Sequence, residues 1–305
     1  MDTREWALII FTILGQLAAG SMLALMIVRA YATTKAGVKE ADRMTDGPLF
    51  MVFPIMGVAL LSSLLHLNNL KNIVGAVPNL ATSWMSREVV ISVVFMVVVF
   101  VYTLLQWRKI GSPVLRDVIG WISALVGVAQ VYAMGLVYMI RTQPSWNTVA
   151  TPISFMVTAL LLGALAVAIA LVVNYNAIQK KDASAAGKQA ELLRGALQGI
   201  AVAVIVLLGV EFLVLPLYMA YLGTYAAESL KVLTVDYGMT LALRLIFVFL
   251  GAGVLAAYLY RNASTAGKEK TLAVLVYCAF LLVLAAEVMG RFLFYVSHYR
   301  FDTII

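Results

Sequence analysis

Three residues with complementary chemistry bracket one short segment of the chain. His66 stands before the segment KNIVGAVPNLATSWMS, and Arg87 and Glu88 follow that segment directly. Together they offer a base that titrates near neutrality, a carboxylate and a fixed cation. Such a set suits a substrate that releases protons when it is oxidised, and a quinol is the obvious candidate. The same groups also suit a proton-coupled transporter, and composition does not separate the two.

The helices that position these residues must lie in a lipid bilayer. Of the 305 residues, 63% are hydrophobic and only 12% are charged, about half the charged fraction of an average soluble domain. No polar stretch is long enough to build a separate soluble domain. We therefore expect an all-α polytopic membrane protein in which residues 1–305 form a single transmembrane helical-bundle domain.

Eight apolar runs are long enough to cross the bilayer, which takes about 20 residues each. Within them, Gly163 and Gly209 are expected to let neighbouring backbones approach closely. The predicted spans are at about 6–30, 48–70, 87–107, 117–140, 151–174, 195–220, 238–260 and 271–296.

Basic residues are distributed unequally between the two sets of loops. One set, which begins with Arg29, carries fourteen Lys and Arg residues, and the other carries seven. Since basic loops stay on the cytoplasmic side, the richer set is predicted to be cytoplasmic. Both termini are then predicted to lie outside, in the periplasm.

With this orientation, most polar residues within the spans fall in the outer half, and the inner half is expected to be an almost wholly apolar scaffold. An ionisable group inside a span is costly, so each is a functional candidate. Structural explanations exist as well, because Glu287 and Arg291 are four residues apart and can neutralise each other. The candidate network comprises Gln16, Glu211, Arg244, Glu287 and Arg291, with Glu211, Glu287 and Asp236 as possible partners of Arg244.

The bracketing residues also have structural explanations. Glu88 is predicted in the first turn of a helix, where the helix dipole favours a carboxylate. Ser86 is a possible cap of that turn. His66 can alternatively bond to a loop carbonyl at the membrane interface.

The sequence offers few ligands for a metal or a redox group. His66 and His298 are the only histidines and Cys278 is the only cysteine, which excludes an iron–sulfur cluster held by four thiolates and a cysteine-rich zinc site. We therefore expect no metal site and no bound cofactor. One haem between the two histidines is the remaining alternative.

Six segments resemble a known family, in order and at matching depths. They are IIFTILGQLAAG, SSLLHLNN, SWMSREVV, QPSWNTVATPISF, TVDYGMTLALRL and LAAEVMGRFLFY. Through them the chain resembles, nearly end to end, the membrane-anchor subunits of anaerobic dimethyl sulfoxide reductases, which belong with molybdopterin oxidoreductases.

The resemblance implies a multi-pass protein of the bacterial inner membrane that takes part in anaerobic respiration. It implies eight helices, no cofactor of its own, and menaquinol as substrate. An iron–sulfur, ferredoxin-like subunit and a molybdopterin catalytic subunit would dock on the outer face. The protein would thus oxidise quinol without carrying out the terminal reduction, and nucleic acid is not an expected partner.

The family's quinol site falls on His66 and Glu88, which the resemblance makes the catalytic pair. Arg87 lies at a variable position and is a weaker quinol-binding candidate. The family's Gly-Ser-Pro after its His-Leu is replaced here by Asn68, Asn69 and Leu70, so the loop beside the site differs.

Two alternative functions remain open at this point. The protein could anchor a polysulfide- or nitrite-reductase-type complex, which differs only in the terminal acceptor. A secondary transporter would need inverted repeats and a site near mid-membrane built from broken helices, and the sequence shows neither.

Overall fold

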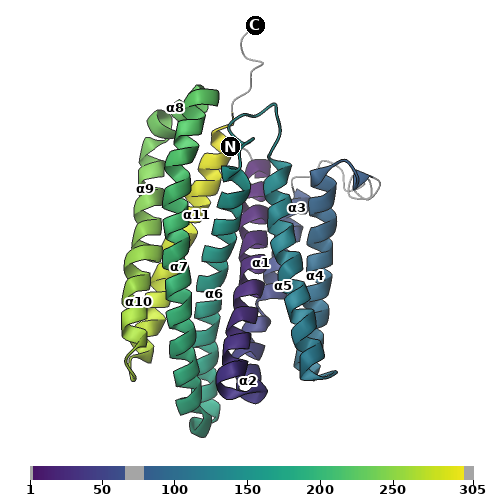
Figure 1. The fold of residues 1–305 in the computed structure, drawn as a ribbon, viewed down its shortest axis with the longest axis vertical. Helices are drawn as coiled ribbons and strands as arrows, with labels where there is room; N and C mark the ends of the chain where they lie inside the picture. The colour runs from purple at the N-terminus through teal and green to yellow at the C-terminus, as the bar shows by residue number, and fades with distance from the viewer. Residues whose placement is uncertain (1–2, 66–78, 299–305) are drawn as a thin grey trace.

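The computed structural model describes residues 3–65 and 79–298, which form an upright bundle of long helices (Figure 1). Eight spans within these residues are long and apolar enough to cross a membrane. The predicted all-α membrane fold with eight spans is therefore confirmed. His66 lies outside the described residues.

The helices begin and end at the following residues. They are α1 (Thr3–Ala36), α2 (Val38–Leu49), α3 (Val52–Leu65), α4 (Trp84–Arg108), α5 (Pro113–Val137), α6 (Ala150–Lys181), α7 (Ala183–Tyr225), α8 (Ala227–Lys231), the π-helical η2 (Val232–Asp236), α9 (Gly238–Val248), the π-helical η3 (Phe249–Leu255), α10 (Ala256–Ala263) and α11 (Glu269–Val296).

Several helices differ from the predicted spans. Helix α7 has 43 residues, because its N-terminal turns carry polar residues that extend beyond the hydrocarbon. The second span consists of α2 followed by α3, and the seventh consists of α9, η3 and α10. The start of α1 and the end of α11 lie at the same end of the bundle (Figure 1), as an even number of spans requires. That this end is periplasmic stays a prediction.

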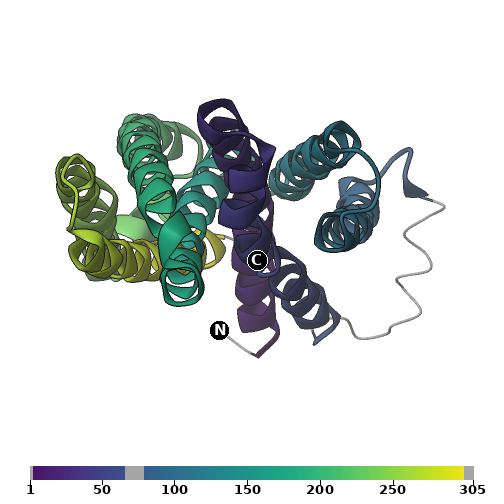
Figure 2. The same ribbon diagram turned by 90° about the horizontal axis from the view of Figure 1, so that it is seen from below.

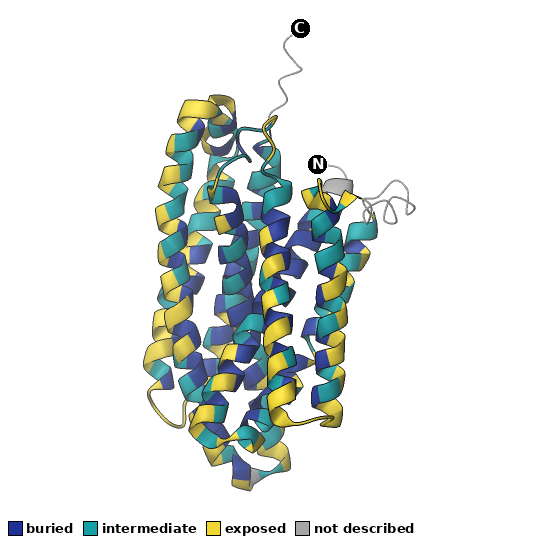
Figure 3. Cartoon of the chain, turned by 45° about the vertical axis from the view of Figure 1, so that its right-hand side comes forward, coloured by how far each residue is buried: buried dark blue, intermediate teal, exposed yellow. Residues whose placement is uncertain are grey.

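The surface of the bundle suits lipid. Large apolar side chains project outward along the helices, among them Leu61, Leu213 and Leu217. Figure 3 shows that exposed positions follow the outside of the helices and that buried positions face inward. In water such a surface would aggregate, whereas in a bilayer it contacts lipid chains.

Helix α1 joins two groups of helices. It lies between α3, α4 and α5 on one side and α6, α7 and α9 to α11 on the other (Figure 2). Its most extensive contact is with α6, where Gly20 faces Gly163. A Cβ atom at Gly20 would come within 1.7 Å of the carbonyl oxygen of Ala159, and one at Gly163 would come within 2.1 Å of the carbonyl carbon of Gly20.

The prediction of close backbone approach at Gly163 is therefore confirmed, and the same prediction for Gly209 is wrong. Nothing lies within 4 Å of a Cβ added at Gly209. Both glycines sit in apolar helices, so only the packing of the helices distinguishes them.

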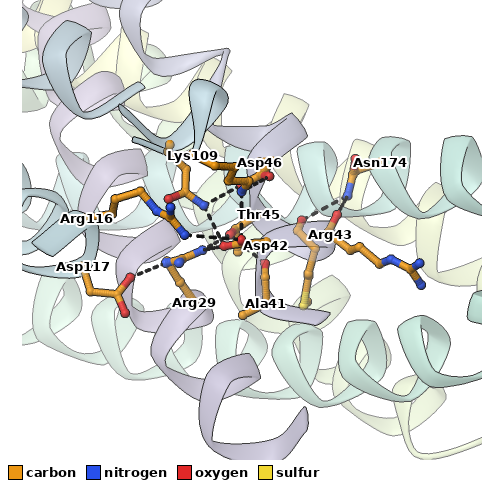
Figure 4. A network of polar contacts seen from close by, with 12 residues as sticks. Arg29, Ala41, Asp42, Arg43, Thr45, Asp46, Lys109, Arg116, Asp117 and Asn174 are labelled. Carbon is orange, nitrogen blue, oxygen red and sulfur yellow. Dashed lines mark hydrogen bonds and ion pairs between the residues drawn. The ribbon is translucent and has the colours of Figure 1, made fainter. Parts of the chain in front are cut away.

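A cluster of charged side chains, the inner cluster, ties α1, α2, α4 and α5 together (Figure 4). It lies at the end of the bundle where α2 is found, opposite the termini (Figure 1). At its centre Arg29, which is 1% exposed, donates from Nε to Asp117 at 2.6 Å and from Nη1 to Asp42 at 2.7 Å. Asp42 also accepts from Lys109 at 2.8 Å. The inner cluster comprises Arg29, Asp42, Thr45, Asp46, Gln106, Lys109, Arg116 and Asp117.

Two expectations are corrected by the inner cluster. Arg29 is not a loop residue, because α1 continues as a helix to Ala36 and buries it. The inner half is consequently not an apolar scaffold. Three cations (Arg29, Lys109 and Arg116) face three carboxylates there, and this balance allows Arg29 and Arg116 to be buried.

The close contact between α1 and α6 predicts that replacing glycine by alanine has opposite effects on stability at Gly163 and at Gly209. Gly163→Ala should destabilise the fold by about 1–3 kcal/mol, because the added methyl group must push the helices apart. Gly209→Ala should stabilise it by about 0.5–1 kcal/mol, because alanine favours the helix and space is free. Unfolding in a detergent titration, followed by tryptophan fluorescence, measures both. Equal effects would contradict the close packing at Gly163.

The inner cluster predicts that Arg29→Met destabilises the fold by about 3 kcal/mol, the lower end for a broken buried pair, since Asp117 is partly exposed. The matched control is Arg43→Met. Arg43 is 37% exposed and its ion pairs with Glu40 and Asp182 are both at 3.5 Å, so its loss should cost about 0–1 kcal/mol. The same detergent titration compares the two, and a mild effect at Arg29 would show that the inner cluster is not a structural clamp.

Candidate functional site

Glu88 lies in the second turn of α4, near the end of the bundle that carries the termini. The helix is capped by Ser83, whose Oγ accepts a hydrogen bond from the amide of Ser86 at 3.3 Å. The prediction that Ser86 caps the helix is therefore wrong, since Ser86 supplies the donor. Glu88 is 8% exposed, so its carboxylate is directed into the bundle rather than towards the lipid.

The side chain of Arg87, the neighbouring residue, binds the turn before α4. Its Nε donates to the carbonyl of Leu80 at 2.8 Å and its Nη2 to that of Ala81 at 2.7 Å. The guanidinium also lies 4.3 Å from the centre of the Trp84 ring. Arg87 thus holds the turn that leads into α4, and the structure does not bring it together with the Glu88 carboxylate.

A pair of tyrosines accompanies Glu88 inside the bundle. The hydroxyl groups of Tyr138, at the end of α5, and Tyr295, on α11, are hydrogen-bonded at 2.6 Å. Both phenols are close enough to Glu88 to interact with it electrostatically. Sequence reasoning missed this pair, because tyrosine near a helix end is typical of the aromatic belt at a membrane interface.

The tyrosines belong to an aromatic cluster that closes this part of the bundle. Trp146 stacks on Phe294 with ring centres 5.2 Å apart and donates from Nε1 to the carbonyl of Phe294 at 2.8 Å. Tyr138 packs edge-on against both rings. The ring of His298 stacks on Trp146 at 5.5 Å, so His298 takes part in packing.

The loop between α5 and α6 is fixed onto this cluster by hydrogen bonds. Thr151 Oγ1 donates to the carbonyl of Trp146 at 2.7 Å, and the hydroxyls of Tyr218 and Tyr221 donate to the carbonyls of Ser145 and Asn147, both at 3.0 Å. Helix α7 thereby holds the loop over the aromatic rings.

Arg291 links the aromatic cluster to α1. Its guanidinium lies 3.5 Å from the centre of the Phe155 ring, and its Nη2 donates to Gln16 Oε1 at 2.9 Å. Both residues are buried. Arg291 also interacts electrostatically with Tyr295 and Glu287, so it stands between the Glu88 side of the bundle and the rest of the network.

The remaining members of the predicted network form two contacts farther along. Glu211 on α7 accepts a hydrogen bond from Arg244 on α9, one of the pairings considered from the sequence. Glu287 accepts from the Thr158 hydroxyl at 2.6 Å. No ion pair between Glu287 and Arg291 occurs among the described residues. The hydrogen-bond partner of Glu287 is Thr158 instead, a residue that sequence reasoning did not single out.

Within the parts of the sequence that the structure describes, no three His, Cys, Asp or Glu side chains are arranged to hold a metal ion. The expectation that the protein has no metal of its own stays a prediction.

Comparison with known proteins assigns the family. Residues 1–296 match the model of the DMSO reductase anchor subunit (DmsC) family. The sequence is 28% identical to the C subunit of the anaerobic dimethyl sulfoxide reductase of Escherichia coli strain K12, over 97% of this protein and 95% of that one. It is 26% identical to the YnfH subunit of the same reductase type in that strain, over 97% and 95% respectively.

A third relative is matched over a shorter region. It is the C subunit of the anaerobic dimethyl sulfoxide reductase of Haemophilus influenzae, 26% identical over 55% of this protein and 59% of that one. With a family match that covers almost the whole sequence and eight helices that can span a membrane, the chain belongs to the DMSO reductase anchor subunit family and is a multi-pass membrane anchor of a dimethyl-sulfoxide-reductase-type complex.

Proposed function

We propose that this anchor binds menaquinol at the periplasmic side of the bacterial inner membrane and oxidises it. The electrons pass to an iron–sulfur subunit docked on that face and then to a molybdopterin catalytic subunit. The observation that carries the proposal is Glu88, a carboxylate buried at the end of an apolar bundle beside the Tyr138–Tyr295 pair, in a member of an anchor family.

The chemistry requires proton acceptors beside the quinol. Oxidation of a quinol to a quinone breaks two O–H bonds, so two protons and two electrons must leave. His66 accepts one proton and hydrogen-bonds the hydroxyl, as the family resemblance implies, and Glu88 relays the proton or orients the histidine. The hydrogen-bonded pair of Tyr138 and Tyr295 interacts electrostatically with Glu88 and so adds polar groups to the surroundings of its carboxylate.

The direction of electron flow follows from the position of the site. The aromatic cluster and Glu88 lie at the same end of the bundle as the start of α1 and the end of α11, the end that the charge distribution predicts to be periplasmic. Electrons released there enter a partner docked on that face, and the protons leave on the same side. Arg87 holds the turn before α4 and so shapes the mouth of the site.

The terminal acceptor is set by the catalytic partner and not by this anchor. The relatives named above are subunits of dimethyl sulfoxide reductases, which favours a sulfoxide over polysulfide or nitrite. The same family match favours an anchor over a secondary transporter.

Replacing the proposed catalytic pair should block quinol oxidation and leave the complex assembled. His66→Arg should abolish reduction driven by a menaquinol analogue, and Glu88→Gln should slow it at least about 100-fold, as expected for loss of a general base. Reduction driven by a viologen dye, which delivers electrons directly to the soluble subunits, should be unchanged. The control Glu228→Gln alters an exposed carboxylate and should keep full quinol activity; undiminished turnover in His66→Arg would rule out the assignment.

Affinity purification of the anchor from anaerobically grown cells should recover two further subunits. Mass spectrometry should identify a ferredoxin-like iron–sulfur protein and a molybdopterin protein, and the preparation should contain both iron and molybdenum. Recovery of the anchor alone, with substrate uptake in proteoliposomes, would instead support a transporter. A different catalytic subunit would support the polysulfide- or nitrite-reductase alternative.

A further inference from the structure

A cavity of about 100 Å³ lies between α6, α7, α9 and α11. The lining residues run from Ala150, at the start of α6, to Ser297, just after α11, so the cavity is in the same outer part of the bundle as Glu88. None of these lining residues comes from α1 to α5. The cavity is therefore separate from the proposed site at Glu88, which is built on α4.

Three charged side chains of this cavity have polar atoms that no described residue satisfies. Glu287 Oε2 accepts from Thr158, whereas its Oε1 has no partner. Glu211 Oε1 accepts from Arg244, whereas Glu211 Oε2 and Arg244 Nε have none. The two glutamates are 3% and 9% exposed. Buried charged groups are rarely left unpaired, and here the free atoms belong to side chains that also line a cavity, which points to a ligand.

The charges around the cavity indicate a neutral ligand. Glu211 is paired with Arg244, and Glu287 interacts electrostatically with Arg244 and Arg291, so two carboxylates face two guanidinium groups. An anion would meet the free carboxylate oxygens, and a cation would meet Arg244. A neutral molecule with hydroxyl groups satisfies all three atoms, because a hydroxyl both donates to a carboxylate and accepts from an N–H.

The apolar walls of the cavity favour a ligand that contains a ring over water molecules alone. Most of the lining is apolar, including Val157, Leu215, Met219, Leu241 and Phe294. A concave site with apolar walls and a few convergent polar groups is typical of small-molecule binding. Water would satisfy the charged atoms and leave these walls unused.

The ligand has a route from the bilayer. The cavity is not fully enclosed, and Ile153, which lines it, is 39% exposed on the surface of α6. Gly290, another lining residue, leaves room for Arg244, since a Cβ atom there would come within 2.5 Å of Arg244 Nε. The glycine thus allows the guanidinium to pack closely against α11.

We propose that this cavity is a second binding site, for a neutral aromatic diol of the quinol class. The hydroxyls donate to Glu211 Oε2 and Glu287 Oε1, one hydroxyl oxygen accepts from Arg244 Nε, and the ring packs against the apolar walls. The choice of a quinol as ligand rests on the proposed function, and the site itself rests on the cavity. No electron transfer is assigned to it.

Photolabelling of the intact complex tests the proposal. The probe is a 1,4-dihydroxynaphthalene that carries a diazirine, kept reduced under anaerobic conditions, and labelled peptides are mapped by mass spectrometry. Label is expected in residues 150–158 and 287–297. Ile153→Trp should block the entrance and remove this label, and the control Leu213→Trp, at a 69% exposed position outside the cavity, should retain it.

Two further measurements keep the test decisive if Ile153→Trp does not fold. Glu287→Gln should raise the probe concentration for half-maximal labelling about tenfold, the change expected when a hydrogen bond to a charged acceptor is lost. In the unaltered complex, neutral menadiol should compete with the probe, and anionic dihydroxynaphthoate should not.

The outcomes separate the cavity site from the proposed function. Label confined to α3 and α4 peptides, with normal quinol turnover, would overturn the cavity site and leave the proposed function standing. Competition by the anionic naphthoate as strong as by menadiol would also overturn it, as would a density map with only water in the cavity at saturating menadiol. No label anywhere and no quinol turnover would overturn the proposed function as well.

Discussion

A charged group inside a bilayer must find its partner within the protein, because the hydrocarbon offers neither water nor counter-ions. Most features of this anchor follow from that constraint. Arg29 lies among carboxylates from two other helices, Arg244 is paired with Glu211 on a neighbouring helix, and Arg291 uses an amide and an aromatic ring. Each such contact joins different helices, so burying charge also fixes the arrangement of the bundle.

Helix α1 connects these contacts. Its inner end carries Arg29, its outer half carries Gln16, and Gly20 between them brings its backbone against α6. One face of α1 therefore meets the α2–α5 group and another meets α6 and α11. A displacement of α1 would therefore disturb the inner cluster and the surroundings of Arg291 together, and the close backbone contact at Gly20 opposes such a displacement.

The outer part of the bundle contains two polar regions in the proposed scheme. Glu88 and its tyrosine pair lie on the α4–α5 side, and the cavity with Glu211, Arg244 and Glu287 lies on the α7–α9 side. Arg291 stands between them and interacts electrostatically with Tyr295 and Glu287. The inner cluster is balanced in charge and joins four elements through short ion pairs, which suits a clamp. The outer group has free acceptors and a donor on side chains that line a cavity with mostly apolar walls, which suits a ligand.

The amino-acid sequence by itself determined the eight spans and the membrane environment, because hydropathy over about 20 residues is a local property. It also identified Gln16, Glu211, Arg244, Glu287 and Arg291 as buried polar positions. Only the tertiary structure decided their partners. Arg291 meets Gln16, 275 residues away, Glu287 meets Thr158 instead of Arg291, and Gly163 rather than Gly209 lies at a close contact. These choices depend on which helix faces which, and helix faces are not distinguished in an apolar sequence whose surface and interior share the same residue types.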